Sequence, residues 1–541
     1  MIGNEIVARC LTMHGVDIAF YLMGAPMLDC EAECERIGMR MIDVRHEQAA
    51  PMMATAYARL RRRPAACMAA SGPGVMNLVT GVANAFADGT PVIVLGGASP
   101  VFQSGMGAFQ EVDQLSVFRP ITRWSERCYQ AERLPEYFHY AFEHALGSAP
   151  GPVYLDLPGD VLYANVDEAA IQWMEVPSRW PRPQGDPESI DRALDMMKAA
   201  ERPVLLSGSG ILWSEAEAEL RQFVERSGIP FYATPQGRGA IPEAHDLSFL
   251  GARSEAFGGT DLIVLAASRQ NYVSEFTRPP RWNKDAKLVQ IDIDAHQIGR
   301  NRPADVGIVG DAGAVLRQLL ERDRGHFAPG RYAAWTGHLE AAHEAKARMQ
   351  EERQASDAMP IHPLRLCREV REFLSDDAVL CVDGQEILTY ARQSIPFQRP
   401  HSLNSGPFGC MGVGLPLALG AKVARPEATV LVLHGDGSFG INAMELDTAV
   451  RHDIPIVCVI SNNAGWTAQQ EGEKVSGQHL GFTRYDEMFE ALGCYGEMVE
   501  DPNDIRPALE RALASGRPAV VNVMVDPTAR GMSTQFTRYE T

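Results

Sequence analysis

Short apolar runs alternate with longer amphipathic stretches along the whole chain. Residues 17–22, 65–71 and 91–95 are mostly apolar and have the length of strands, whereas residues 46–60 and 74–87 have the length and spacing of helices. Strands that are apolar on both faces and separated by helices are typical of a parallel sheet with helices on both sides. The pattern therefore predicts the α/β class, built from doubly wound parallel sheets.

A turn containing proline precedes five of the strand-like runs in this chain. The prolines are Pro91, Pro152, Pro203, Pro455 and Pro518. Proline suits the first residue of a strand, where the sheet loses no hydrogen-bond donor. Five such units in one chain favour several similar α/β domains over one large sheet.

Two stretches of unusual composition predict the domain boundaries. Residues 177–187 contain four prolines and cannot form a regular helix. Residues 338–358 are polar, have a helical pattern and are followed by Met359-Pro360. We expect three doubly wound domains of ordinary size at residues 1–176, 188–340 and 359–525, followed by a tail at residues 526–541.

The charge and the cysteine content narrow the class of protein. The 541 residues include 69 acidic and 50 basic ones, so the formal net charge is −19, opposite to that of proteins which bind nucleic acid or anionic membranes. No uncharged apolar run is long enough to span a membrane. The ten cysteines form no C-x-x-C pair and lie mostly in apolar runs, as expected for reduced, packed thiols. We expect a cytoplasmic protein with neither a nucleic-acid nor a membrane partner.

The third block contains a motif suited to a diphosphate and a metal ion. An apolar strand at residues 429–434 leads into Gly435-Asp436-Gly437-Ser438, and the next apolar strand leads into Ser461-Asn462-Asn463. A glycine-rich turn between a strand and a helix lets backbone N–H groups approach phosphate oxygens. Asp436 and Asn463 offer oxygen ligands at the ends of neighbouring strands, and Mg²⁺ prefers oxygen ligands that it shares with phosphate. The motif predicts a magnesium ion that bridges the protein and a diphosphate.

This motif resembles that of the thiamine-diphosphate enzymes, because Asp436 is followed 27 positions later by the second asparagine of a pair. The resemblance implies that the metal is bound by Asp436, Asn463 and the backbone carbonyl of Gly465. The residues implied to hold the diphosphate are Gly384, Gln385, Gly435, Gly437 and Ser438.

The segment Gly409-Cys410-Met411-Gly412 resembles the part of the family that shapes the cofactor. Met411 matches the bulky apolar residue that holds the cofactor in a bent form, and the Gly409 carbonyl would accept a hydrogen bond from the cofactor amine. Taken without the other motifs, Met411 would instead be an ordinary core residue at the start of a helix.

In the first block, Glu47 is the candidate activating acid. Thiamine chemistry needs a carboxylic group that hydrogen-bonds to the aminopyrimidine, and the run His46-Glu47-Gln48-Ala49-Ala50 resembles the family's glutamate motif. Ser71, which precedes Gly72 at the next strand end, is a candidate cofactor contact. The alternative is an exposed glutamate in the first turn of a helix.

Glu47 and the diphosphate motif lie nearly 400 residues apart. In the family that the motifs resemble, the pyrimidine-binding domain of one subunit meets the diphosphate-binding domain of another. The resemblance therefore implies at least a homodimer with a shared active site, and a homotetramer is common among such enzymes.

The resemblance covers nearly the whole chain and points to the acetolactate-synthase-like superfamily, closest to its branch of 2-hydroxyacyl-CoA lyases, oxalyl-CoA decarboxylase and benzaldehyde lyase. Gln110 matches an active-site loop in which its amide would donate to a substrate oxygen; the alternative is a polar loop without a role. Two departures weaken an assignment as an acetolactate synthase. Val273 stands where those enzymes carry an arginine, and no tryptophan lies near Gly472.

The middle block resembles a nucleotide-binding domain around Arg269 and around Asp292 and Asp294. The branch named above binds ADP there, whereas acetolactate synthases bind a flavin such as FAD. Acidic residues at a strand end can accept hydrogen bonds from ribose hydroxyls. A degenerate domain that binds no nucleotide is an equal alternative.

The resemblance implies a lyase or carboligase that acts on a small 2-hydroxyacyl or 2-oxo acid substrate, free or as a CoA ester, through a C2 carbanion and an enamine of the cofactor. Condensation of 2-oxo acids, as in acetolactate synthases, and decarboxylation of a 2-oxo acid or of oxalyl-CoA are the alternatives. An idle relative that only binds the cofactor is a further alternative. The presence of Glu47, Asp436 and Asn463 argues against it.

Overall fold

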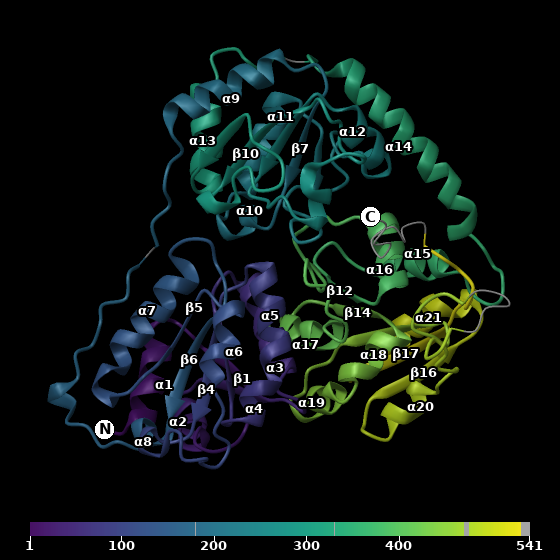
Figure 1. The fold of residues 1–541 in the computed structure, drawn as a ribbon. Coiled ribbons are helices and arrows are strands. Elements are labelled where there is room, and N and C mark those ends of the chain that lie inside the picture. Colours follow the sequence, from purple (N-terminus) through teal and green to yellow (C-terminus); the bar gives the residue numbers. More distant parts are fainter. Residues whose placement is uncertain (179, 329, 470–474, 532–541) are drawn as a thin grey trace.

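The computed structural model describes residues 1–178, 180–328, 330–469 and 475–531. Three parallel sheets of six, five and six strands form the centres of three domains, as the sequence predicts. The middle domain lies at the top of Figure 1, with the first domain below it on the left and the third on the right. The Gly472 region and most of the predicted tail, residues 532–541, lie outside the described residues.

The first domain is a six-stranded sheet with the order β2-β1-β3-β4-β6-β5. Its strands are β1 (Ile18–Leu22), β2 (Arg40–Asp43), β3 (Ala65–Ala69), β4 (Val92–Ala98), β5 (Trp124–Arg127) and β6 (Val153–Pro158). Its helices are α1 (Gly3–Met13), α2 (Leu28–Arg36), α3 (Ala49–Arg61), α4 (Pro73–Asn77), α5 (Val79–Asp88), α6 (Gln114–Phe118), α7 (Leu134–Leu146) and α8 (Gly159–Leu162).

The middle domain has a five-stranded sheet with the order β11-β10-β9-β7-β8. Its strands are β7 (Pro203–Ser207), β8 (Phe231–Ala233), β9 (Leu262–Ala266), β10 (Lys287–Asp292) and β11 (Val306–Val309). Its helices are α9 (Pro187–Ala199), α10 (Gly210–Trp213), α11 (Glu217–Ser227), α12 (Arg253–Gly259) and α13 (Ala312–Arg322). The proline-rich stretch before α9 and the long helix α14 (Ala333–Gln354) connect it to the other two domains along the two edges of the molecule (Figure 1).

The third domain repeats the topology of the first. Its strand order is β13-β12-β14-β15-β17-β16. When β12 to β17 are matched in turn to β1 to β6, this is the strand order of the first sheet. The strands are β12 (Val379–Asp383), β13 (Ser402–Leu403), β14 (Val430–Gly435), β15 (Val457–Asn462), β16 (Tyr495–Val499) and β17 (Ala519–Met524). The helices are α15 (Pro363–Phe373), α16 (Gln385–Ser394), α17 (Gly414–Ala424), α18 (Asp436–Asn442), α19 (Glu445–Arg451), α20 (Tyr485–Glu490) and α21 (Ile505–Ala514).

The first and third domains share one hydrophobic core, whereas the core of the middle domain is separate. Helices α3 and α17 form the centre of the shared core and lie side by side in Figure 1. They approach so closely that a Cβ on Gly420 would lie 2.2 Å from the carbonyl oxygen of Met53. The two domains therefore form one packed body around these helices.

The predicted proline turns agree with the structure, since β7 begins at Pro203 and Pro91, Pro152 and Pro518 directly precede β4, β6 and β17. One element differs from the prediction. The helical pattern of residues 442–451 predicts that a helix begins only after the glycine-rich turn, but α18 already begins at Asp436, because the turn itself is helical. Nine of the ten cysteines are buried, as predicted. Within the described residues, no helix combines the length and the apolar character needed to cross a membrane.

Candidate active site

A pocket at the carboxyl edge of the third sheet collects most of the predicted cofactor residues. Nine of them line it: Gly384, Gln385, Met411, Gly435, Asp436, Gly437, Ser438, Asn463 and Gly465. They come from the ends of β12, β14 and β15 and from the turn before α17. In a parallel sheet, these strand ends meet at one edge, where α/β proteins bind their ligands.

The predicted metal ligands provide oxygen donors only. Asp436 brings a carboxylate, Asn463 an amide oxygen and Gly465 a backbone carbonyl to the same pocket. Burial raises the pKa of Asp436 to about 6, so a neighbouring cation would stabilise the ionised form of this side chain. The donor set fits Mg²⁺, which binds oxygen and keeps positions open for phosphate and water.

The first asparagine of the pair has a different environment from the second. Asn462 is fully buried, and its Nδ2 donates to Asn522 Oδ1 at 3.1 Å, while its Oδ1 accepts from the Ala464 N–H at 3.2 Å. Asn462 therefore fixes the end of β15, which leaves Asn463 at the pocket. This division of roles agrees with the choice of the second asparagine as the metal ligand.

Glycines bring the backbone close to the space that the diphosphate would fill. Gly384 has a φ of +113°, and a Cβ there would lie 3.0 Å from the Gly435 nitrogen. A Cβ on Gly437 would lie 2.6 Å from the indole of Trp466. Helix α16 begins at Gln385, so the N–H groups of its first turn have no partner within the helix. Backbone N–H groups at such a turn are suited to phosphate oxygens.

Two residues of the predicted set, Ser438 and Gly409, have environments that differ from those of the others. The Ser438 hydroxyl lies 3.1 Å from the carbonyl oxygen of Asp383 and 3.0 Å from that of Gly435. It donates its one hydrogen within the protein, which leaves its oxygen lone pairs and its backbone for a ligand. Gly409 lies in an exposed turn with a φ of +70° and does not line the pocket.

Met411 lies at the rim of the pocket, three residues before α17. Its side chain is 45% exposed, so it is not the core residue of the alternative interpretation. The carboxylate of Asp383 accepts a hydrogen bond from the Gly414 N–H at 2.9 Å and thereby fixes the start of α17. The apolar Met411 side chain is therefore held beside the metal and phosphate residues by a rigid element.

Glu47 lies in the turn between β2 and α3, two residues before the helix. It is 9% exposed, so it is not the exposed glutamate of the alternative interpretation. Its Oε2 accepts a hydrogen bond from Asn77 Nδ2 at 2.9 Å, and a Cβ on Gly74 would lie 3.4 Å from its Oε1. Asn77, at the end of α4, is a neighbour that the sequence motif does not reveal.

Gln110 is held by the strand end that carries Ser71. The Ser71 hydroxyl donates to Gln110 Oε1 at 2.7 Å, and a Cβ on Gly72 would lie 2.7 Å from the Gln110 carbonyl oxygen. Gln110 has a φ of +61°, a strained conformation for a residue with a side chain. Among the described residues, none accepts a hydrogen bond from Gln110 Nε2. The N–H₂ donor of the amide is therefore not used within the described part of the chain.

A buried polar network that the sequence did not suggest supports this loop. Gln114 accepts from the Gly72 N–H at 2.8 Å and donates to Asp156 Oδ1 at 2.6 Å. Tyr154 also donates to Asp156, and Arg127 binds the other carboxylate oxygen at 2.5 Å. The network joins two strands to the turn beneath Gln110. Its residues come from three separate segments, so no local pattern could have identified it.

The two groups of predicted residues do not meet in one pocket of the single chain. Glu47, Ser71 and Gln110 surround the segment 71–77 of the first domain. The described residues that line the diphosphate pocket belong to the third domain, apart from Asp526 and Ala529 directly after it. Each group therefore contains only part of the predicted active-site residues.

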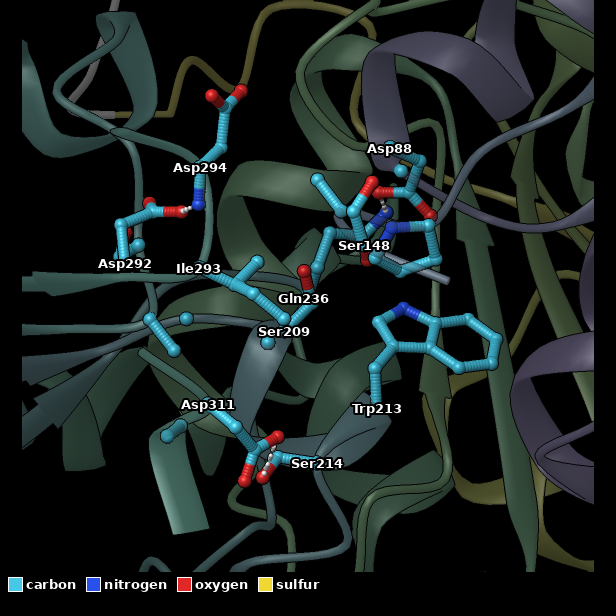
Figure 2. Close-up of a pocket in the computed structure, with 18 of the residues that line it drawn as sticks. Asp88, Ser148, Ser209, Trp213, Ser214, Gln236, Asp292, Ile293, Asp294 and Asp311 are labelled. Atoms are coloured by element: carbon cyan, nitrogen blue, oxygen red, sulfur yellow. Dashed lines mark hydrogen bonds between the residues drawn. The ribbon is translucent and has the colours of Figure 1, made fainter. Parts of the chain in front are cut away.

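A separate cavity of about 450 Å³ lies where the middle domain meets the other two. Figure 2 shows Asp292 and Asp294 on one side of it, Asp311 and Ser214 on another, and Trp213, Gln236 and Asp88 opposite. The turn Gly208-Ser209-Gly210 between β7 and α10 also lines it. Burial raises the pKa of Asp292 to about 6. Of the residues singled out in the sequence, Arg269, Val273, Asp292 and Asp294 line this cavity.

Together, the fold and the first pocket define a three-domain α/β protein whose third domain is suited to a metal and a diphosphate. Three family models of the thiamine pyrophosphate enzymes match the chain in order. The N-terminal TPP binding domain matches residues 1–117, the central domain matches residues 190–319, and the C-terminal TPP binding domain matches residues 384–523. The chain belongs to the thiamine pyrophosphate-dependent enzymes of the acetolactate synthase-like family.

Relatives with three different activities resemble the chain to nearly the same degree. A probable acetolactate synthase of Mycobacterium bovis is 34% identical over 539 residues, which cover 98% of this chain and 96% of the relative. A 2-hydroxyacyl-CoA lyase of Arabidopsis thaliana is 32% identical over 550 residues, covering 97% and 96%. An oxalyl-CoA decarboxylase of Escherichia coli is 30% identical over 551 residues, covering 99% and 97%. These identities establish the family and do not single out one branch.

Proposed function

We propose that this chain is a thiamine-diphosphate- and Mg²⁺-dependent lyase or carboligase that acts on a 2-hydroxyacyl or 2-oxo acid substrate. The observation that carries the proposal is the arrangement of Gln110, whose Oε1 is bound by Ser71 while its N–H₂ donor is left for a substrate oxygen. The same loop carries the apolar side chains of Phe102, Met106 and Phe109, which are 70%, 75% and 83% exposed. A neutral donor among apolar groups is suited to a carbonyl or hydroxyl oxygen next to an acyl chain.

When bound, thiamine diphosphate would supply the electron sink for breaking or forming a C–C bond next to a carbonyl. In this proposal, Asp436, Asn463 and Gly465 hold the Mg²⁺, and the backbone around Gly384 and Gly435 receives the diphosphate. Met411, which lines the same pocket, would offer the cofactor an apolar contact.

In the same proposal, Glu47 hydrogen-bonds to the aminopyrimidine and holds the proton that this ring needs. Gln110 orients the substrate oxygen, and the exposed apolar side chains of its loop contact the acyl chain. Neither residue forms a covalent bond to the substrate.

We further propose that two chains complete each other's active sites, at least as a homodimer. Two observations support this: among the described residues, none of the first or middle domain lines the diphosphate pocket, and apolar side chains are exposed around both half-sites. On the third domain these are Phe408, Met411, Ile441, Met444 and Trp466. Exposed apolar patches of this kind mark interaction surfaces. Sedimentation of the purified chain with cofactor should give a dimer or tetramer, and a stable monomer with full activity would contradict the shared site.

We also propose that the middle cavity binds a nucleoside diphosphate group. A Gly-Ser-Gly turn after β7, the carboxylates of Asp292 and Asp294 at the end of β10 and a volume of about 450 Å³ support this. ADP and FAD share that group, and two measurements separate them. A yellow protein whose released cofactor absorbs as a flavin indicates FAD, whereas a colourless protein that binds ADP in calorimetry indicates ADP. Binding of neither would contradict the proposal.

A substrate screen tests the reaction. The holoenzyme would be incubated with pyruvate, with benzoin-type acyloins, with a 2-hydroxyacyl-CoA ester and with oxalyl-CoA, and the products identified by mass spectrometry. Cleavage of the acyloin or of the hydroxyacyl ester to an aldehyde supports the proposal. Acetolactate from pyruvate would favour the second candidate, suggested by the acetolactate synthase relative. Absence of thiamine diphosphate binding in calorimetry with Mg²⁺ would identify an idle relative.

A further inference from the structure

The turn that carries Glu47 is bound from outside its own domain. Glu445, the first residue of α19 in the third domain, accepts hydrogen bonds from the two N–H groups directly before Glu47. Its Oε1 lies 3.1 Å from both the Arg45 and the His46 nitrogen, and its Oε2 lies 3.2 Å from the Arg45 nitrogen. Arg45 and His46 are exposed, so these contacts are not a consequence of general burial of the turn.

Glu445 is itself fixed in place. It is 1% exposed, and the Thr448 hydroxyl donates to its Oε2 at 2.7 Å. Burial raises the pKa of Glu445 to about 7, against the opposing effect of the hydrogen bonds from Thr448, Arg45 and His46. A carboxylate that accepts several N–H and O–H groups orients them more strongly than a neutral acceptor does.

A second side chain of the third domain binds the residue after Glu47. Asn442, at the end of α18, accepts from Gln48 Nε2 at 2.7 Å and donates to the Gly412 carbonyl oxygen at 2.7 Å. Gly412 directly follows Met411. Glu445 and Asn442 thus bind both sides of Glu47 to the third domain, and Asn442 also binds the turn of Met411.

We propose that Glu445 and Asn442 are positioning residues, which set the place of the Glu47 carboxylate through the backbone of Arg45 and His46 and through Gln48. The inference rests on the proposed role of Glu47. Because hydrogen bonding between Glu47 and the cofactor depends on their distance and direction, a small rotation of this turn weakens it without unfolding the domain. Neither residue contacts the pocket that would hold the metal and the diphosphate.

The experiment measures how fast bound thiamine diphosphate exchanges its C2 proton for solvent deuterium, which needs no substrate. Glu445→Gln keeps the size of the side chain and replaces one acceptor oxygen with a donor. Glu47→Gln is the positive control. Glu243→Gln is the control, since Glu243 is also buried, accepts from the Phe397 N–H at 2.8 Å and joins the middle domain to the third. Because Glu243 also forms a buried ion pair with Arg238, the exchange rate of this variant is measured on the folded protein.

With cofactor and Mg²⁺ saturating, we expect exchange to slow at least tenfold in Glu445→Gln and in Asn442→Ala, and to stay within twofold in Glu243→Gln. Hydrogen exchange mass spectrometry should show faster exchange of the Arg45 and His46 amides in Glu445→Gln. Glu445→Asp, which restores the carboxylate, should recover part of the rate.

The outcomes separate this inference from the proposed function. If Glu47→Gln itself leaves the C2 exchange unchanged, the proposed role of Glu47 is wrong. If Glu47→Gln slows it while Glu445→Gln and Asn442→Ala leave it unchanged, the positioning inference alone is overturned. A purely structural role for Glu445 predicts a lower melting temperature with a normal C2 exchange rate in the folded protein, and this result would also overturn it.

Discussion

The first and third domains have the same strand order, yet they place opposite chemistry at equivalent points. In each, the second strand of the domain leads to a turn and then to a buried helix, α3 or α17, with proline as its third residue. The turn before α3 carries the acidic Glu47, and the turn before α17 carries the apolar Met411. One scaffold therefore presents two different groups from matching positions, and the fold alone does not determine which group appears.

The strand ends differ in the same way. In the first domain, β3 leads into Ser71-Gly72, whose polar groups bind other protein groups. In the third domain, the equivalent β14 leads into Gly435-Asp436, where a carboxylate faces a pocket. The two matching strand ends therefore carry different groups, and in the proposed function the third domain binds the diphosphate while the first domain supplies an acid and an amide.

Glu47→Gln tests the polar half of the comparison and should have the largest effect. Removing the acid should lower turnover by about 10³-fold, because the amide cannot hold the proton that the cofactor ring needs. Circular dichroism and cofactor affinity should stay close to those of the wild type. In contrast, Met411→Leu conserves volume and should change turnover less than tenfold. Equal losses in the two variants would refute the assignment of different roles to these matching turns.

The burial of Glu445 should make stability depend on pH. Burial raises the pKa of Glu445 from 4.5 to about 7, so the folded chain binds the extra proton between these values. The free energy of unfolding therefore falls as pH rises through this range, on the order of 3 kcal/mol in all, and Glu445→Gln lacks this contribution. Urea unfolding at pH 5 and pH 8 should show a steeper fall for the wild type.

The ionisable side chains around Glu445 are the same in wild type and variant, so the difference between the two proteins isolates Glu445. They are Asp43, Arg45 and His46 from the first domain and Asp447, Arg451 and His452 from the third. The same dependence on pH in wild type and variant would mean that Glu445 does not titrate between pH 5 and pH 8.

The shared core predicts that α3 and α17 tolerate no added side chain at their crossing. Gly420→Ala should lower the free energy of unfolding by about 2 kcal/mol, because the new methyl group meets the Met53 backbone. Gly337→Ala, in the exposed helix α14, meets nothing within 4 Å and should raise it by up to about 1 kcal/mol. Thermal unfolding of both variants measures the difference. A neutral Gly420→Ala would show that the two helices can separate at little cost.

The smallest effect is expected for Ser71→Ala. Loss of the hydroxyl frees Gln110 Oε1, so the amide samples more orientations, and kcat/KM should fall about fivefold. Ser116→Ala, which removes a hydrogen bond to Asp113 at the start of α6, is the control and should leave kcat/KM unchanged. If Ser71→Ala instead prevents cofactor binding, its predicted role as a cofactor contact would be supported over the positioning of Gln110.

The sequence was sufficient to predict the parallel sheets and the third-domain pocket, because both depend on short motifs. The apolar runs mark the strands, and Asp436 and Asn463 lie at strand ends that a parallel sheet brings together. The binding of Glu445 to the Arg45 backbone joins positions 400 residues apart. Such a contact depends on how two domains pack, and neither segment carries a local signal for the other. The start of α18 at Asp436 was missed because glycine normally marks a turn.

The crossing of α3 and α17 also has a consequence for the order in which the chain is made. Helix α3 ends at Arg61 and α17 begins at Gly414, so about 350 residues are synthesised between them. At 5–20 residues per second, this takes on the order of half a minute. The middle domain, with its separate core, can fold within that time. During this time the apolar face of α3 is not covered by α17. The nascent chain therefore presents a surface for chaperones until the third domain leaves the ribosome.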